Sequence, residues 1–359
     1  MIKKIDAYII KKFLGTFVYA IILIISIAIV FDFTERIDDF IEKNISLEEI
    51  IFDYYLNFIP YFINLFTALF TFIAVIFFTS KMAYNTEIIA ILSSGVSFRR
   101  MLVPYFVAAL LIAVFSFFLN AYIIPPANKG RNDFSEKYLQ SPYRNYDRNI
   151  HRQIQPGLFV YMERFNVSNQ VGYKFAMERF AEGELKSKLI SDYIKWNEED
   201  SSWTIHNYYI RNFDGLYETL DKGRELDTIL NLTPANFNFR NQIVEAMTSP
   251  ELNRFIENER MLGVESIEPY LIEKYRRWSD PCSTFILTLI GVALSSRKVR
   301  GGSGLHIGIG LGLSFSYILF MRVASQFAIK GNLDPMIASW IPNMLYAVIG
   351  IVLYRMAPK

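Results

Sequence analysis

The chain has 359 residues, of which 52% are hydrophobic and 16% aromatic, and its formal net charge is +2. This nearly neutral balance gives no reason to expect a nucleic-acid ligand or a strongly acidic partner. The single cysteine, Cys282, excludes an internal disulfide and a cysteine-based metal cluster, and the three histidines are widely separated. We therefore expect no metal site in this chain.

Six apolar segments are candidates for crossing a bilayer, which takes about 20 residues in an α-helix. The predicted spans are residues 13–33, 54–80, 101–124, 281–296, 303–322 and 335–354. The second span contains Pro60, which membrane helices tolerate, and the third is expected to stop at Pro125 and Pro126. The predicted fold is an α-helical membrane protein with six transmembrane helices and an inserted β-jelly-roll-like domain.

The placement of lysine and arginine predicts the topology. Residues 1–12, 81–100, 297–300 and 355–359 are basic, whereas the loop at 32–53 is acidic. Basic loops stay in the cytoplasm, so both termini are expected there and the large middle region on the opposite side. The expected organisation is a transmembrane half at 1–127, an external domain at 128–277 and a second transmembrane half at 278–359.

The external domain shows the period of two that is typical of β-strands. Aromatic and β-branched residues alternate with polar ones at 158–165, 173–180, 188–196 and 203–213, and turns are expected at 197–202 and 214–215. About eight short strands indicate a β-sandwich or a jelly roll. Phe159, Tyr161, Phe175 and Met177 are candidates for lining an open interior, and the competing interpretation is that they belong to a closed core. The last part, residues 249–278, has a helical pattern.

The loop from Lys81 to Arg100 connects the second and third spans. Tyr84, Ile88, Ile91 and Leu92 fall on one face of a short helix predicted at about 82–94, and Gly95 offers a stop in the left-handed conformation. Such a helix can dock into a groove of a cytoplasmic partner. It can equally lie on the lipid surface.

Motifs of catalysis are missing from the sequence. There is no nucleotide-binding P-loop, no H-E-x-x-H and no G-x-S-x-G. No ionisable residue lies near the middle of the first three spans, where an ion-coupled transporter usually needs one. We therefore do not expect an enzyme, and an ion-coupled transporter is disfavoured. If the protein moves a substrate, the energy should come from a partner.

Several stretches together resemble one family, the LptF/LptG (YjgP/YjgQ-type) permeases of the lipopolysaccharide exporter of Gram-negative bacteria. The loop TEIIAILSSGVSFRRM has Glu87, Ala90, Ser94, Gly95 and Ser97 in the family's E-x-x-A-x-x-x-S-G-x-S pattern. PPANKGRNDF after the third span and the last 80 residues also resemble the family, as does the three-plus-three layout around a β-rich insert. The short insert and the stretch DFTERIDDF resemble LptG more than LptF.

The resemblance implies an inner-membrane permease subunit that extracts lipopolysaccharide and passes it to a periplasmic bridge. Its implied partners are a second LptF/LptG-type permease, a dimeric LptB-type ATPase in the cytoplasm and an LptC/LptA-type bridge protein. The chain itself would hold no cofactor, because ATP and magnesium bind to the ATPase. The helix at 82–94 would couple to that ATPase through Glu87, Ala90, Ile91, Ser94 and Gly95.

The resemblance also implies a lipid path along the first and fifth spans. The apolar gate candidates are Ile27, Phe31, Phe315 and Leu319, and the basic candidates for contacting lipid phosphates are Arg36, Lys43 and Arg322. The apolar four can equally be ordinary lipid-facing or packing residues. Arg36 can be neutralised by Glu35 or Asp39, and Arg322 can be an interfacial anchor.

Two other functions remain open from the sequence. One is a permease of another ATP-driven lipid or lipoprotein system, although those place a large external domain after the first span rather than after the third. The other is a membrane-anchored binding or scaffold protein whose β domain does the work.

Overall fold

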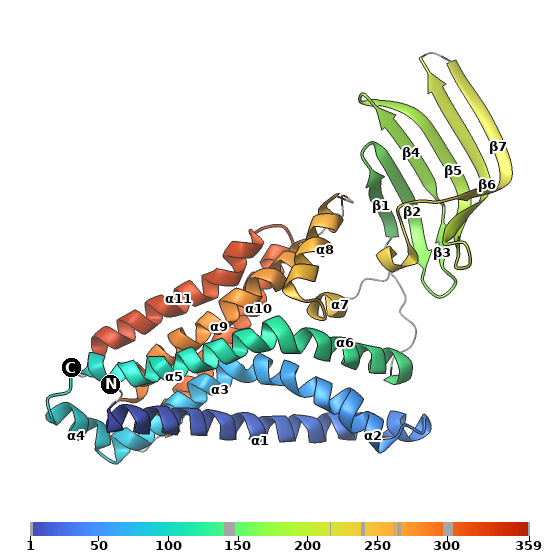
Figure 1. Cartoon of the computed structure of the whole chain (residues 1–359). Helices are drawn as coiled ribbons and strands as arrows, with labels where there is room; N and C mark the ends of the chain where they lie inside the picture. Colours follow the sequence, from blue (N-terminus) through green and yellow to red (C-terminus); the bar gives the residue numbers. More distant parts are fainter. Residues whose placement is uncertain are drawn as a thin grey trace. The chain divides into compact units, whose positions relative to one another are not determined.

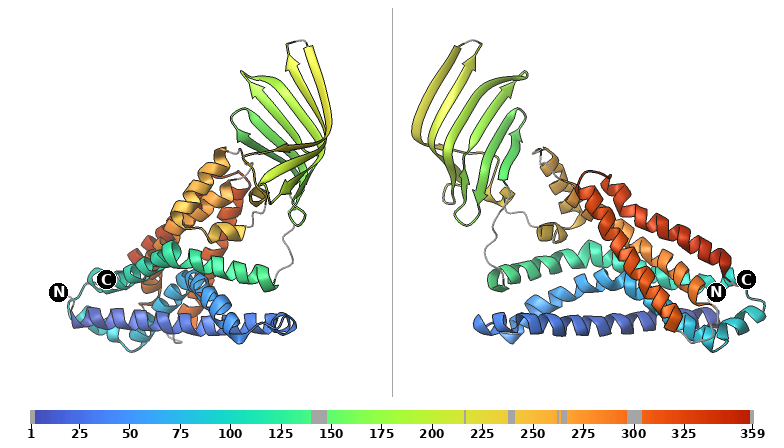
Figure 2. Two further views of the ribbon diagram at one scale, coloured as in Figure 1. Left: turned by 45° about the vertical axis from the view of Figure 1, so that its right-hand side comes forward. Right: turned by 180° about the vertical axis from the view of Figure 1, so that it is seen from behind.

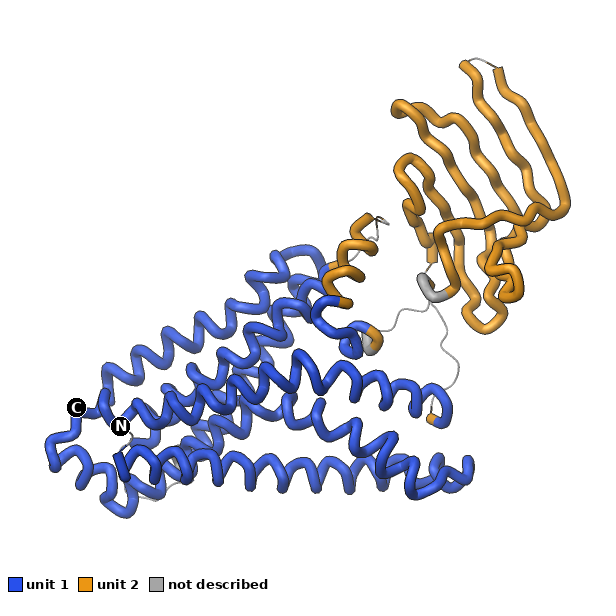
Figure 3. Tube along the Cα trace, viewed as in Figure 1, with its two compact units in different colours: residues 1–138, 244–250, 268–359 blue, residues 139–243, 251–267 orange. Residues whose placement is uncertain are grey.

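The computed structural model describes residues 3–139, 148–215, 217–237, 241–261, 263, 267–296 and 304–357. The chain divides into two compact units (Figure 3). Unit 1 contains residues 1–138, 244–250 and 268–359, and unit 2 contains residues 139–243 and 251–267. The basic cluster predicted at 297–300 lies outside the described residues.

Unit 1 is built from long helices (Figure 1). Its elements are α1 (Lys4–Glu42), α2 (Leu47–Glu49), η1 (Ile50–Tyr55), α3 (Leu56–Tyr84), α4 (Glu87–Ser93), α5 (Phe98–Phe118), η2 (Leu119–Ile123), α6 (Ile124–Phe134), η3 (Ser135–Leu139), α9 (Glu268–Ser295), α10 (Gly304–Ile329) and α11 (Pro335–Met356). Within the described residues, five helical stretches are long and apolar enough to cross a membrane: Lys4–Glu42, Leu47–Tyr84, Phe98–Leu139, Ile307–Ile329 and Pro335–Met356. The chain is therefore a multi-pass membrane protein.

The fourth predicted span, at 281–296, lies in α9 and is not confirmed as a span. The first half of α9 is strongly charged, so its apolar part is short. That apolar part nevertheless packs against α3, α5, α10 and α11 and buries Leu287 and Ile290. Gly291 permits close approach to α3, because a Cβ there would come within 2.8 Å of a Val75 methyl group.

The helix of the third predicted span continues past Pro125 and Pro126. The helical path runs through η2, whose π-helical turns are wider, into α6 and η3. The two prolines occupy the first turn of α6, where a missing backbone N–H breaks no intrahelical hydrogen bond. The end of the helix therefore does not mark the end of the span, and a membrane span that stops at the prolines stays a prediction.

The helix predicted at 82–94 consists of two pieces. α3 runs on to Tyr84, and Thr86 then takes the left-handed conformation at φ 63°, which separates α3 from α4. Tyr84 is exposed and does not share the buried face of Ile88. Gly95 has φ 87°, so its predicted left-handed conformation is confirmed.

Unit 2 contains a single described sheet (Figures 1 and 2). Its strands are β1 (Arg148–Gln155), β2 (Leu158–Asn166), β3 (Val171–Tyr173), β4 (Ala176–Ala181), β5 (Glu184–Asn197), β6 (Ser202–Asp214) and β7 (Tyr217–Thr228), followed by η4 (Pro234–Phe237), α7 (Asn241–Glu245) and α8 (Ser249–Met261). The four strands predicted from the sequence and their two turns are confirmed, as is the helical pattern after residue 249. A jelly roll is not confirmed.

The strands form an antiparallel meander in which β3 and β4 act as one interrupted strand. Both pair with β2 and with β5, and the register continues unchanged from Tyr173 to Ala176. The interruption falls at Lys174, which has φ 53°. Trp203 lies in the buried face, and its indole N–H donates to the Leu232 carbonyl at 2.7 Å.

The register divides the four candidate interior residues between two faces. Phe175 is fully buried and Met177, opposite Val160, packs against the same apolar cluster. Phe159 and Tyr161 are one residue out of phase and point to the other face, where Phe159 contacts the Phe180 ring. The four residues therefore cannot line one interior, because side chains alternate along a strand.

Candidate functional site

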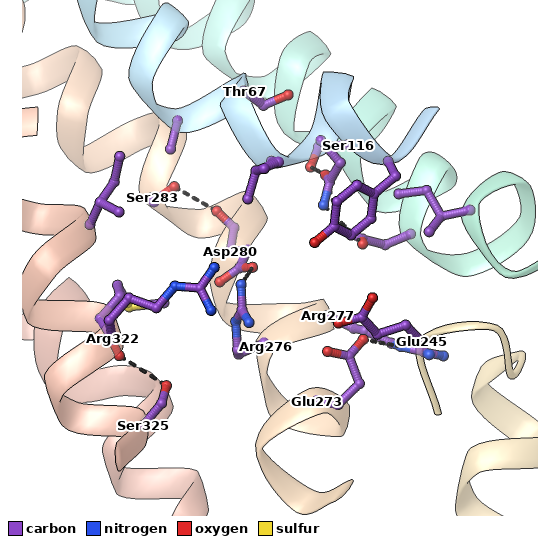
Figure 4. A pocket seen from close by; sticks show the side chains of 18 of the residues that line it. Thr67, Ser116, Glu245, Glu273, Arg276, Arg277, Asp280, Ser283, Arg322 and Ser325 are labelled. Atoms are coloured by element: carbon purple, nitrogen blue, oxygen red, sulfur yellow. Dashed lines mark hydrogen bonds and ion pairs between the residues drawn. The ribbon is translucent and has the colours of Figure 1, made fainter. Parts of the chain in front are cut away.

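A pocket lies in unit 1 between α3, α5, η2, α6, α7, α9 and α10 (Figure 4). Its polar lining comes mainly from α9, and its apolar wall comes from side chains of α3, α6 and α10. The residues that line it are Tyr61, Asn64, Leu65, Thr67, Ala68, Ser116, Asn120, Ile124, Asn128, Glu245, Glu273, Arg276, Arg277, Asp280, Ser283, Tyr317, Ile318, Met321, Arg322 and Ser325.

Two ion pairs follow one another along α9. Arg276 Nη2 lies 3.3 Å from Asp280 Oδ2, and Arg277 Nε lies 3.3 Å from Glu273 Oε1. Both pairs have i,i+4 spacing, which places the partners on adjacent helical turns. They come directly before the apolar part of α9, so the charges meet at the edge of an apolar wall.

The segment at 244–249 is held against this cluster by two buried side chains. Arg277 is 6% exposed and donates to the Met247 carbonyl at 2.8 Å and to Ser249 Oγ at 3.2 Å. From α6, Asn128 Nδ2 donates to the Glu245 carbonyl at 3.2 Å. The carboxyl group of Glu245 is thereby brought into the pocket lining. Burial and the neighbouring Glu273 carboxylate raise the pKa of Glu245.

An amide network lines the side formed by α3 and η2. Asn64 Nδ2 donates to Asn120 Oδ1 at 3.0 Å, and Ser116 Oγ donates to Asn64 Oδ1 at 2.7 Å. Buried amides and hydroxyls of this kind are satisfied by each other rather than by lipid. They keep the wall of the pocket polar inside an otherwise apolar bundle.

One arginine that lines the pocket and a second that stacks on a lining residue form no ion pair with a carboxylate among the described residues. Arg322 from α10 lines the pocket and forms no ion pair or hydrogen bond there. Arg131 from α6 lies over the ring of Tyr61, with its guanidinium carbon 4.9 Å from the ring centroid. Guanidinium groups bind phosphate and carboxylate oxygens in a bidentate manner. Beside the apolar wall, the arrangement suits an anionic head group joined to an apolar chain.

The predicted coupling residues lie on α4 and in the two positions that follow it. Glu87 is its first residue, and its two carboxylate oxygens accept hydrogen bonds from the Tyr8 hydroxyl at 3.0 Å and from Asn85 Nδ2 at 3.3 Å. Ala90, Ser94 and Gly95 are exposed, whereas Ile91 packs against the core. The exposed residues therefore form a small surface on which a partner can dock, and coupling remains a prediction.

The predicted gate residues are exposed but lie on separate helices. Ile27 and Phe31 are on α1, and Phe315 and Leu319 are on α10. In the described residues α1 packs mainly on α3 and α5, whereas α10 packs on α3, α9 and α11. Within this single chain, the pair on α1 and the pair on α10 therefore do not form a common wall.

Arg36 and Lys43 each contact a group of this chain and do not line an open site. Arg36 Nε lies 3.0 Å from Asp32 Oδ1, so the neutralising residue is Asp32 rather than Glu35 or Asp39. Lys43 donates from Nζ to the Tyr138 carbonyl. Of the three basic lipid candidates, only Arg322 lies in the pocket.

The pocket residues of α9 were not among the predicted site residues. Their signal in the sequence is the pattern Glu273, Arg276, Arg277 and Asp280 next to an apolar run, which places opposite charges on consecutive helical turns. Asn64, Asn128 and Glu245 carry no such local signal, because they approach α9 from three different elements.

The fold and the pocket define a class: a multi-pass helical membrane protein with a β-rich insertion and a mixed polar and apolar site, as expected of a permease that handles an amphiphile. The family model described as "Lipopolysaccharide export system permease LptF/LptG" matches residues 7–356. The chain belongs to this family, and its resemblance to the family is confirmed. The match does not distinguish LptG from LptF. A comparison with curated individual proteins found no match.

Proposed function

We propose that this chain is the inner-membrane permease subunit of an ATP-driven lipopolysaccharide exporter, which takes lipopolysaccharide from the membrane and hands it to a periplasmic bridge. Membership of the LptF/LptG family supports export of lipopolysaccharide. The observation that carries the proposal is the pocket, where the uncommitted Arg322 lies beside an apolar wall. Lipid A combines phosphates with acyl chains and needs both surfaces.

The proposed assembly contains a second LptF/LptG-type permease, a dimeric LptB-type ATPase and an LptC/LptA-type bridge. The separation of Phe31 on α1 from Leu319 on α10 supports a second permease, because each helix needs a facing surface that this chain does not supply. The exposed surface of α4 supports an ATPase that docks there. ATP and magnesium would bind to that ATPase, and this chain supplies the path of the lipid.

The proposed topology has six spans, with α9 as the fourth in chain order. Burial of Leu287 and Ile290 among other membrane helices supports this assignment. Both termini and α4 then face the cytoplasm, and unit 2 lies in the periplasm as the jelly-roll-like element that passes lipid onward. Phe175 and Met177 remain its candidate lining residues.

Co-reconstitution in vesicles tests the function. The chain, its partner permease and the ATPase are incorporated with lipopolysaccharide, and transfer to a soluble bridge protein is followed with and without ATP. Transfer that requires ATP is expected, and transfer at the same rate without ATP would contradict the proposal.

Cysteine labelling tests the topology: Ser168→Cys should react from the periplasmic side, and Ser94→Cys only after the inner membrane is broken.

A further inference from the structure

Two polar contacts connect the first turns of α1 to α4 and to the start of α5. Asp6 accepts two hydrogen bonds from Arg100 at the start of α5, Nη1 to Oδ1 at 2.8 Å and Nη2 to Oδ2 at 2.6 Å. Tyr8 donates its hydroxyl to Glu87, the first residue of α4, at 3.0 Å. The Asp6 carboxylate also accepts from the Lys3 amide and caps α1. Paired hydrogen bonds between a guanidinium and a carboxylate fix orientation as well as distance.

An apolar core makes this connection rigid. Ile9 and Phe13 are fully buried, and Ile88 from α4 is 1% exposed in the same cluster. The Phe13 ring stacks on Phe78 from α3 at 5.6 Å. Close-packed side chains transmit displacement, because the core has no free volume to absorb it. The start of α1 and α4 should therefore move together.

Farther along the same helix the packing is loose. Between Ile25 and Phe40 no side chain of α1 is buried, although α1 is continuous from Lys4 to Glu42. This stretch contains Ile27 and Phe31, the gate candidates. A displacement imposed at Asp6 is carried along the continuous helix to this segment, whose side chains are at most partly buried and which is held at Asp32 by hydrogen bonds from the Tyr54 and Tyr55 hydroxyls, each at 3.2 Å.

We propose that the first turns of α1, from Lys4 to Phe13, carry movement of α4 to the loosely packed segment of α1, through the Asp6–Arg100 pair and the Tyr8–Glu87 hydrogen bond. The inference rests on the proposed function, since an ATPase must move α4. It assigns Asp6, Arg100 and Tyr8 as positioning residues. Glu87 then has a second role, because the carboxylate that faces the ATPase also holds α1.

The test uses the full complex in vesicles and measures three quantities: bound ATPase, ATP hydrolysed and lipopolysaccharide released. Asp6→Arg and Arg100→Asp should each keep ATPase binding and hydrolysis but lower lipid released per ATP about fivefold or more, the range of typical coupling energies. The double exchange, Asp6→Arg with Arg100→Asp, should restore most of that ratio. Arg99→Asp is the matched control, since Arg99 has the same charge and forms no ion pair among the described residues.

Tyr8→Phe keeps the inference testable if the charge variants fail to fold, because it removes one hydroxyl and leaves the ring. It should lower lipid released per ATP about twofold or more, because the hydrogen bond between α1 and α4 is lost. Wild-type ratios for Tyr8→Phe and for either single charge variant would overturn the inference. Failure of the wild-type complex to couple hydrolysis to release would instead contradict the proposed function.

Discussion

The two ends of unit 1 share α3 and α5 but are held together by different forces. At the α4 end, α1, α3, α4 and α5 share an apolar core around Phe13 and Ile88, both almost fully buried. At the pocket end, α3, α5 and α9 meet around charged and amide groups such as Arg276 and Asn64. Apolar contacts in a bundle bind one arrangement tightly, whereas polar groups can exchange partners. The difference agrees with our proposals of a rigid end that receives movement and an adaptable end that receives a ligand.

Buried side chains also contribute differently to stability at the two ends. In a membrane helix an apolar side chain such as Phe13 stabilises the bundle through close van der Waals packing, since lipid is as apolar as the core. A buried ion pair such as Arg277 with Glu273 contributes little net stability, because desolvation of both charges offsets their attraction. The ion pairs of the pocket end therefore add little to stability, and four predictions test this difference between the two ends.

The largest effect is expected from Phe13→Ala. Removing a fully buried aromatic ring from the α4-end core leaves a cavity, and such changes cost about 3–5 kcal/mol of unfolding free energy. Thermal unfolding of the purified protein in detergent measures it. Val18→Ala on the same helix is the control, because Val18 is 52% exposed and its truncation should change stability little. Equal effects of the two variants would contradict a rigid core at this end.

Glu87→Lys should come next, and it acts on assembly instead of folding. A charge pair that is desolvated in a docked interface costs about 2–5 kcal/mol when one partner is removed, and charge reversal adds repulsion. We expect weakened ATPase association or hydrolysis uncoupled from export, measured on the co-purified complex. Ser93→Ala, at the end of the same helix, should have little effect. Wild-type export by an intact Glu87→Lys complex would exclude α4 as the coupling element.

At the pocket end, Arg322→Gln should weaken lipid binding without destabilising the protein. Arg322 forms no ion pair among the described residues, so its removal breaks none, in contrast to removal of Arg276 or Arg277. Loss of a charge-assisted hydrogen bond to a phosphate costs about 1.5–3 kcal/mol, or roughly tenfold or more in affinity. Binding of lipopolysaccharide to the reconstituted permease pair measures it. Lys330→Gln, farther along the same chain and outside the pocket lining, should bind normally.

The smallest effect is a pH dependence from Glu245. Its pKa is raised by burial, so the folded protein holds the proton more tightly than the unfolded chain. Stability is therefore lost as pH rises from the ordinary glutamate pKa through the raised value. Glu245→Gln should stabilise the protein at pH 8 and have almost no effect near pH 4, followed by thermal unfolding across pH. Glu257→Gln, an exposed control, should show no such trend, and a stabilisation by Glu245→Gln that is the same at all pH values would argue against the buried acid.

Local patterns in the sequence predict most of the elements of this protein. The apolar runs identify the long helices, since a helix in lipid must satisfy its own backbone hydrogen bonds and present apolar side chains everywhere. The alternation at 158–213 identifies β2 to β6 for the corresponding reason in a sheet. Gly95 is predictable because glycine adopts a left-handed conformation at little cost.

Local patterns do not reveal which face of an element is buried or where a helix is interrupted. Phe159 and Val160 are equally apolar, and only pairing with β4 decides that Val160 faces the core. Thr86 breaks the predicted loop helix although threonine is compatible with helices. Pro125 and Pro126 continue a helical path because η2 widens just before them.

Segment length, charge placement and motif order are enough to identify a membrane permease of the LptF/LptG type with a β-rich insertion, because they are properties of the linear chain. The tertiary structure assembles the site. Asn128, Glu245 and Arg322 lie far apart in the sequence and meet only when three helices converge on α9. It likewise decided that Asp6 holds Arg100, since a contact across 94 residues depends on packing that no local pattern encodes.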